Sequence, residues 1–213
     1  SVAANRTDYQ QSWAFCLLLK LHDKPHDYAV LLDFHDDVVV LDSTGEPKEM
    51  EFYQVKSKET GNWTITQLLR CPKNKDDKPG LSICGKMYAN KMAFPNVTKS
   101  VNFVTNARFS VRLQDGDKEK DVDSFEVKQL ANEIGEKFTE ALRNEHQLSA
   151  LDDVPTHFWS EPLPHRGHQD QVKGRFAEFL ENQKPEGKFA VGAAFRAISS
   201  IIARKTGEER TPA

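Results

Sequence analysis

Residues 28–56 read YAVLLDFHDDVVVLDSTGEPKEMEFYQVK, and this stretch decides the fold. The apolar runs at 28–34 and 38–41 are typical of buried or half-buried strands, and 51–56 is a third candidate strand. Residues 43–47 contain Gly and Pro and are typical of a hairpin turn. An antiparallel return through this turn would place the third strand beside the second.

Polar side chains gather where these strands would meet. Asp33, Asp36 and Asp37 lie at the junction of the first two strands, and Gln54 and Lys56 lie in the third. Because side chains alternate between the two faces of a strand, Gln54 and Lys56 point the same way. We therefore expect a carboxylate, an amide oxygen and an ammonium group to converge at one end of a sheet.

This set of groups suits phosphodiester chemistry. Mg²⁺ prefers hard oxygen ligands and retains several waters, so one or two protein oxygens suffice. The metal lowers the pKa of a bound water, and a nearby lysine orients that water or neutralises developing charge. Asp37, Gln54 and Lys56 supply these parts. A purely structural interpretation is also open at this point, because acids favour turns and a QVK triplet is common in edge strands.

The rest of the chain predicts a mixed order of helices and strands. Apolar residues recur at helical spacing in several segments, and short apolar runs between them predict further strands. Helices are expected at 9–21, 64–70, 81–93, 124–145, around 172–180 and around 191–202, strands at 100–105, 109–113 and 156–163, and a charged loop at 114–123.

Composition excludes two classes of protein. The 213 residues are 38% hydrophobic, too apolar for a disordered chain, and no apolar run approaches the roughly 20 residues that span a bilayer. We expect one domain over 1–213. The cysteines, Cys16, Cys71 and Cys84, are odd in number and form no CxxC pair, and no signal peptide opens the sequence, which favours a reducing cytoplasm.

Charge is unevenly distributed along the chain. The formal net charge is only −3, but residues 57–112 carry ten Lys and Arg against three Asp and Glu. A basic segment of this kind indicates a polyanion-facing surface or, alternatively, a solvated face. The modest total charge therefore does not exclude a nucleic-acid partner.

The DD-V…QVK arrangement, preceded by the helix with YQQSWA at 9–14, resembles the PD-(D/E)xK nuclease superfamily in its QxK variant. More narrowly, residues 36–42, 51–58 and 61–64 resemble the endonuclease domain of CD-NTase-associated protein 4, also called the domain of unknown function 4297 family. The resemblance covers most of the chain and is most specific over 9–64. It implies an α/β fold of the restriction-endonuclease type, with a mixed central sheet flanked by helices.

The resemblance also implies roles for individual residues. Asp37 matches the metal-binding Asp, Gln54 the Gln or Glu of the (E/Q)xK motif, and Lys56 the catalytic lysine. The expected cofactor is Mg²⁺ or Mn²⁺, held by Asp37, the Gln54 oxygen and the backbone carbonyl of Val55. Because Gln54 replaces a charged ligand, metal affinity in the absence of DNA should be weak.

Accessory positions follow from the same resemblance. Asp36 is an alternate ligand or an outer partner of the site. Asp33 stands where the family usually has Glu, so its shorter side chain reaches a metal less directly. Gln11 is the expected polar residue of the first helix at the site, and Gln10 fits nearly as well.

The basic segment would supply the DNA contacts. Lysines neutralise backbone phosphates and give salt-dependent, sequence-tolerant binding. Lys58 is the leading candidate near the scissile phosphate, and Lys73, Lys75 and Lys86 are further candidates.

We therefore predict a metal-dependent endonuclease domain that cleaves double-stranded DNA. The resemblance implies an anti-phage effector of the CBASS type, activated by oligomerisation through a sensor (SAVED) domain outside this chain, of which 1–213 is the N-terminal part. Self-association or an ATPase companion is the related expectation for partners, and no membrane is expected. The alternatives are a catalytically inactive DNA-binding or assembly module of a defence complex, and a nuclease acting on RNA.

Overall fold

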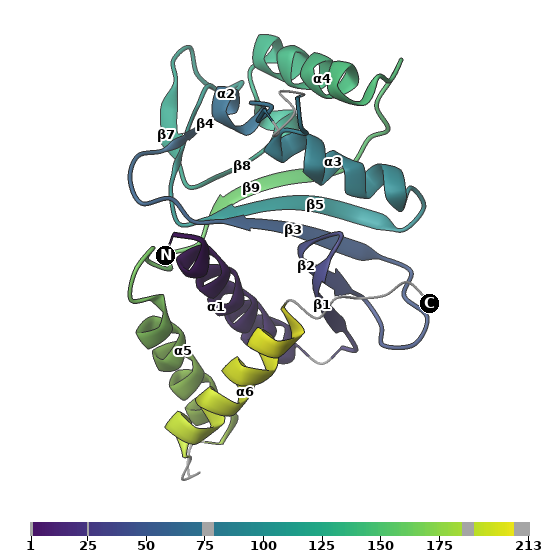
Figure 1. Cartoon of the computed structure of the whole chain (residues 1–213). Coiled ribbons are helices and arrows are strands. Elements are labelled where there is room, and N and C mark those ends of the chain that lie inside the picture. The colour runs from purple at the N-terminus through teal and green to yellow at the C-terminus, as the bar shows by residue number, and fades with distance from the viewer. Residues whose placement is uncertain (1, 25, 74–78, 185–189, 207–213) are drawn as a thin grey trace.

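The computed structural model describes residues 2–24, 26–73, 79–184 and 190–206. Within these residues a six-stranded sheet lies at the centre (Figure 1), with the strand order β1-β2-β3-β5-β9-β8. Its strands are β1 (Ala29–Phe34), β2 (Asp36–Leu41), β3 (Met50–Lys56), β5 (Thr98–Thr105), β9 (Thr156–Ser160) and β8 (Ser124–Glu126).

The sheet combines two kinds of pairing. β1, β2 and β3 form an antiparallel meander, in which Val38 of β2 lies opposite Tyr53 of β3. β3, β5 and β9 then pair in parallel, and β8 is antiparallel to β9. The predicted hairpin return from the second strand to the third is therefore confirmed, and the acids at the start of β2 lie beside the end of β3.

Helices cover both faces of the sheet (Figure 1). α1 (Val2–His22), α5 (His168–Gln183) and α6 (Val191–Lys205) pack on one face, and α3 (Ile83–Ala93) and α4 (Asn132–His146) lie on the other. Each face has its own apolar core. Tyr53 and Val55 belong to the core beneath α1, whereas Phe52 belongs to the core beneath α3. Alternation along β3 thus sends Gln54 and Lys56 toward the α3 face.

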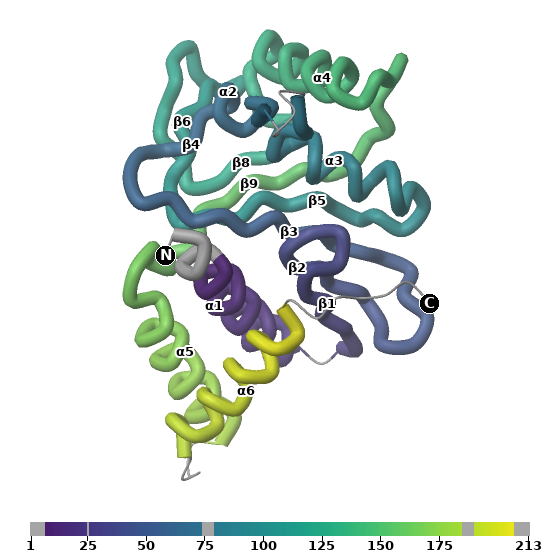
Figure 2. The backbone as a smooth tube through the Cα atoms, in the orientation of Figure 1, coloured from purple at the N-terminus to yellow at the C-terminus, as the bar shows by residue number. Residues whose placement is uncertain are grey.

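A smaller sheet and a short helix lie on the α3 side. The chain leaves β3, passes through this region and returns to the central sheet as β5 (Figure 2). The small sheet contains β4 (Trp63–Thr64), β6 (Phe109–Val111) and β7 (Lys120–Val122), and the adjoining short elements are α2 (Ile65–Leu68) and the 3-10 turn η1 (Val127–Gln129).

The mixed α/β fold expected from the sequence is confirmed, with two corrections. The helix predicted over 124–145 begins only at Asn132, because residues 124–126 form β8 against β9. Phe125 of β8 stacks on Phe158 of β9 with ring centroids 4.7 Å apart. The pairing of β8 with β9 therefore overrides the helical spacing that Val127 and Leu130 share with the apolar residues of α4. The predicted loop at 114–123 likewise contains a strand, β7.

In the described residues no helix has the length and apolar character needed to cross a membrane.

Candidate active site

Asp37, Gln54 and Lys56 meet where the start of β2 adjoins the end of β3. Oδ2 of Asp37 accepts hydrogen bonds from Gln54 Nε2, from the Val55 backbone N–H at 2.7 Å and from Lys56 Nζ at 3.0 Å. The antiparallel pairing of β2 with β3 brings these groups to one end of the sheet. The structure therefore places together the three residues that the sequence singled out.

The ion pair between Asp37 and Lys56 is partly sheltered from water. The Asp37 side chain is 16% exposed and the Lys56 side chain 33% exposed. A lower local dielectric strengthens such a pair relative to one on the open surface. The Asp37 contacts named above all fall on Oδ2, which favours the other oxygen, Oδ1, as the one that faces an incoming cation.

Asp36 occupies a different position from its neighbour. Its Oδ1 accepts from the Asp37 backbone N–H at 2.9 Å, and its Oδ2 accepts from Asn90 Nδ2 at 2.8 Å. Burial, together with the negative charge of Asp37, raises the pKa of Asp36 to about 7. Asn90, on α3, was not anticipated from the sequence. Its only signal was a polar residue among the apolar positions of a predicted helix.

An open cleft of about 560 Å³ exposes these groups. One wall is the turn between β1 and β2, where Asp33 and His35 have positive φ values of 52° and 58°. This left-handed conformation is uncommon for residues other than glycine, although Asp and His tolerate it better than most. The opposite wall is α3, which contributes the exposed Lys86. The lining residues are Asp33, His35, Asp36, Asp37, Gln54, Lys56, Leu81, Lys86, Ala89 and Asn90.

The first helix reaches the site through Gln10 and not Gln11. Gln10 Nε2 donates to the Val55 carbonyl oxygen at 3.3 Å, a long and weak hydrogen bond. Gln11 instead lines a separate pocket between α1, α5 and α6. Both residues lie on α1, and consecutive residues of a helix point in different directions, so only one of the two faces β3. The contact with β3 therefore falls on Gln10, the alternative that the sequence left open, and the accessory role itself stays a prediction.

Lys58 was expected near the scissile phosphate, but it does not line the cleft. β3 ends at Lys56, so the alternation that places Lys56 does not extend to Lys58. Lys58 Nζ donates to the Asn62 carbonyl oxygen and, at 2.9 Å, to Gln67 Oε1, and it lies 4.7 Å from the centre of the Trp63 ring. Burial by these neighbours lowers the pKa of Lys58.

The other predicted DNA-contacting lysines lie in different places. Lys86 borders the cleft from α3. Lys73 is exposed, and its backbone forms an isolated β-bridge with Pro79. Lys75 lies outside the described residues. Of these candidates in the described part of the chain, Lys86 is the one that lines the cleft.

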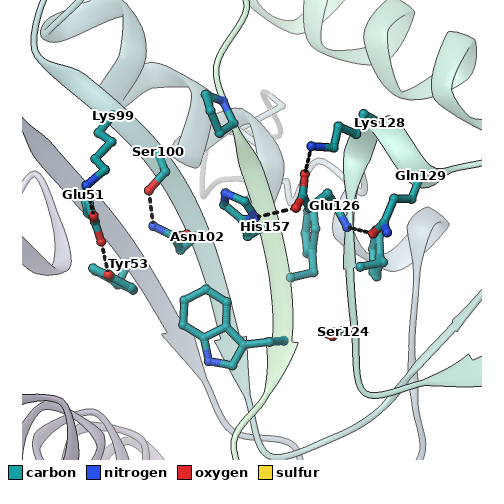
Figure 3. A pocket seen from close by; sticks show the side chains of 14 residues that line it. Glu51, Tyr53, Lys99, Ser100, Asn102, Ser124, Glu126, Lys128, Gln129 and His157 are labelled. Atoms are coloured by element: carbon teal, nitrogen blue, oxygen red, sulfur yellow. Dashed lines mark hydrogen bonds and ion pairs between the residues drawn. The ribbon is translucent and has the colours of Figure 1, made fainter. Parts of the chain in front are cut away.

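A larger hollow of about 740 Å³ lies on the reverse face of the sheet (Figure 3). Tyr53, in its wall, is adjacent to Gln54 on β3, and consecutive strand residues face opposite sides. Charged groups in this hollow pair with one another. Glu126 contacts Lys128 at 2.6 Å and His157 at 3.7 Å. The hollow is thus separate from the cleft that contains Asp37.

The cleft fits a hard divalent cation. Asp37 supplies a partly buried carboxylate and Gln54 an amide oxygen, and oxygen donors are what Mg²⁺ and Mn²⁺ prefer. The Val55 carbonyl, the third expected donor, is not among the lining residues and accepts the hydrogen bond from Gln10. In the described ranges no group of three or more His, Cys, Asp or Glu side chains is placed to hold a metal. Mg²⁺ does not require such a group, because it retains waters and binds through one or two carboxylates plus substrate phosphate.

Comparison with known proteins agrees with this geometry. Residues 1–206 match the family model described as Cap4, dsDNA endonuclease domain. No curated protein matches the chain. The match spans α1, the three antiparallel strands, α3 and every residue of the cleft. The chain therefore belongs to the Cap4 family of double-stranded DNA endonuclease domains and is a DNA endonuclease domain.

Proposed function

We propose that this domain hydrolyses phosphodiester bonds of double-stranded DNA with Mg²⁺ or Mn²⁺ held by Asp37, Gln54 and the Val55 carbonyl. The observation that carries the proposal is the convergence of Gln54, Lys56 and the Val55 amide on one carboxylate oxygen beside an open cleft. A hairpin with a purely structural role does not require an amide and an ammonium group to donate to the same carboxylate oxygen.

The residues of the cleft divide the work of hydrolysis. The cation, when bound, activates water and offsets negative charge on the phosphate. Lys56, already 3.0 Å from Asp37, orients the attacking water and neutralises charge that builds up on the phosphate oxygens. The water oxygen bonds to phosphorus as the bond from phosphorus to the leaving sugar oxygen breaks. The water releases a proton to solvent, and the leaving oxygen takes one up.

DNA approaches the cleft along α3 in this proposal. Lys86 is exposed on α3 at the border of the cleft and is suited to a backbone phosphate. Lys73 belongs to the same basic segment and is exposed, and Lys75 stays a candidate from the sequence. Lys58 contributes less, because its ammonium group already has three protein neighbours.

Control of the domain comes from elsewhere in the protein. We infer a cytoplasmic anti-phage effector of the CBASS type, activated when a sensor domain outside this chain, or an ATPase companion, brings copies together. Gln54 supports this view. With an amide in place of a carboxylate, the site offers Asp37 as its principal charge and Lys56 opposes it, so metal binding depends on DNA or assembly.

Plasmid cleavage tests the proposal. Supercoiled DNA is incubated with Mg²⁺ or Mn²⁺ and the chain at high concentration or fused to an oligomerising partner, alongside Lys56→Ala and Asp37→Ala. Circular dichroism establishes that all three proteins are folded. We expect the unaltered chain to cleave the plasmid and both variants to leave it intact. Equal cleavage by all three proteins contradicts the proposal, and DNA binding without cleavage would identify an inactive module. An RNA substrate run in parallel tests the remaining alternative.

A further inference from the structure

α3 carries a buried amide side chain directed at the site. Asn90 is 3% exposed, and its Nδ2 donates to Asp36 Oδ2 at 2.8 Å. Asn is a mediocre helix former, and burying its amide costs free energy unless the amide is hydrogen-bonded. The bond to Asp36 therefore accounts for an otherwise unfavourable residue on the inner face of α3.

Two adjacent carboxylates compete for one metal position. In regular β2 geometry Asp36 and Asp37 would face opposite sides of the sheet, yet both line the same cleft. The tight β1–β2 turn, with Phe34 paired to Asp36 across the single residue His35, accounts for this departure. Asp36 is therefore close enough to the cleft to displace Asp37 as the ligand if its side chain rotates to another staggered position.

The contacts of Asp36 oppose that rotation. One carboxylate oxygen is held by Asn90 and the other by the backbone N–H of Asp37. Asn90 thus joins α3 to the β2 backbone through one carboxylate. Held at both oxygens, the Asp36 side chain cannot rotate without losing these hydrogen bonds, so this bridge limits both Asp36 and the peptide that carries Asp37.

We propose that Asn90 is a positioning residue that acts through Asp36. It holds the Asp36 carboxylate against the Asp37 amide, so that Asp37 presents its outward oxygen to the metal and Asp36 does not. The consequence for metal binding rests on the proposed function. The positioning itself is a property of the metal-free chain and is tested separately.

The first measurement needs no metal. In an amide NMR spectrum of the ¹⁵N-labelled chain, the Asp37 N–H resonance reports its hydrogen bond to Asp36. We expect Asn90→Ala to move this resonance substantially, and Asp36→Ala to move it in the same direction. Met92→Ala is the matched control, because Met92 lies on the same helix, is 44% exposed and does not line the cleft. An Asp37 resonance that is unchanged in Asn90→Ala overturns the proposal.

The second measurement is Mn²⁺ binding by calorimetry to the unaltered chain, Asn90→Ala, Asp36→Ala and the double variant, each in the presence of a short double-stranded DNA whose linkages resist hydrolysis. Loss of the hydrogen-bonding partner of a metal ligand typically weakens binding about 10- to 100-fold. Because Asn90 acts on Asp37 only through Asp36, we expect Asn90→Ala to fall at the lower end of this range, about tenfold. Adding Asn90→Ala to Asp36→Ala should change nothing further. If the double variant binds Mn²⁺ more weakly than Asp36→Ala by the full factor seen for Asn90→Ala alone, Asn90 does not act through Asp36, and the proposal is contradicted. A much larger loss in Asp36→Ala than in Asn90→Ala does so as well, because Asp36 would then hold the metal itself.

The two proposals fail in different ways. If the unaltered chain binds no Mn²⁺ even in the presence of DNA while Asn90→Ala still moves the Asp37 resonance, the metal-dependent function is wrong and the positioning is upheld. If Mn²⁺ binds and DNA is cleaved but the resonance does not move, the positioning is wrong and the function is upheld.

Discussion

Gly85 on α3 stands where a side chain would collide with Glu145 of α4. A Cβ at this position would lie 1.9 Å from Oε1 and 2.4 Å from Cδ of Glu145. The Glu145 carboxylate accepts hydrogen bonds from the Ser82 backbone N–H and, at 2.8 Å, from Ser82 Oγ. Ser82 Oγ in turn caps α3 by accepting from the Gly85 N–H at 2.8 Å. Gly85→Ala must therefore displace the carboxylate that anchors the first turn of α3.

The magnitude follows from two opposing effects. Displacing the carboxylate leaves the fully buried Ser82 without its charged acceptor, at a cost of about 3 kcal/mol for the two bonds. Replacing Gly by Ala within a helix returns about 1 kcal/mol. We expect Gly85→Ala to lower the free energy of unfolding by about 2 kcal/mol. In a Glu145→Ala background the obstruction is gone, and the same substitution should raise the free energy of unfolding by about 1 kcal/mol.

Urea denaturation of four proteins measures this reversal of sign. The set comprises the unaltered chain, Gly85→Ala, Glu145→Ala and the double variant, each followed by circular dichroism. The coupling between the two sites should approach about 3 kcal/mol, the upper part of the range for contacting residues. If Gly85→Ala destabilises both backgrounds equally, Glu145 is not what excludes the side chain, and the reasoning from this contact is refuted.

Two further predictions concern charged residues. Burial alone would raise the pKa of Glu161, but hydrogen bonds and charge from Lys20 and Arg175 outweigh it and lower that pKa. Ionised Glu161 therefore stabilises the fold above the ordinary carboxyl pKa, and this contribution is lost as pH falls through the lowered value. Glu161→Gln should lower the free energy of unfolding by about 2 kcal/mol at neutral pH and by less in acid. Urea denaturation at several pH values measures this difference, and a loss that does not change with pH would contradict the prediction. Lys86→Ala should reduce the slope of log binding constant against log salt by about 1 in DNA titrations, whereas Lys58→Ala should leave it unchanged. The opposite order would place the phosphate contact at Lys58.

Local sequence patterns predicted the core of the site well. The apolar runs after Asp37 and through Gln54 mark strands, and the turn at 43–47 between them, with Gly45 and Pro47, favours an antiparallel return. Strand alternation then sets Gln54 and Lys56 on one face, opposite Val55. The observed β2–β3 register brings both side chains to Asp37. These relations span short distances along the chain, so periodicity and turn chemistry suffice to derive them.

Predictions failed where a contact depends on distant packing. Residues 124–126 pair as a strand with β9, although Val127 and Leu130, which follow them, continue the apolar spacing of the helix. Lys58 follows the end of β3 and turns toward Trp63 and Gln67, which alternation along the strand does not foresee.

The sequence by itself determined the antiparallel return from β2 to β3, the acid–amide–lysine set and the basic segment that follows it. Only the tertiary structure decided that Gln10 and not Gln11 faces Val55, and that Asn90 of α3 holds Asp36. The physical reason is the range of the information. A period of two residues is written in neighbouring positions, whereas the phase of a helix against a sheet is set by the packing of whole apolar faces from distant parts of the chain.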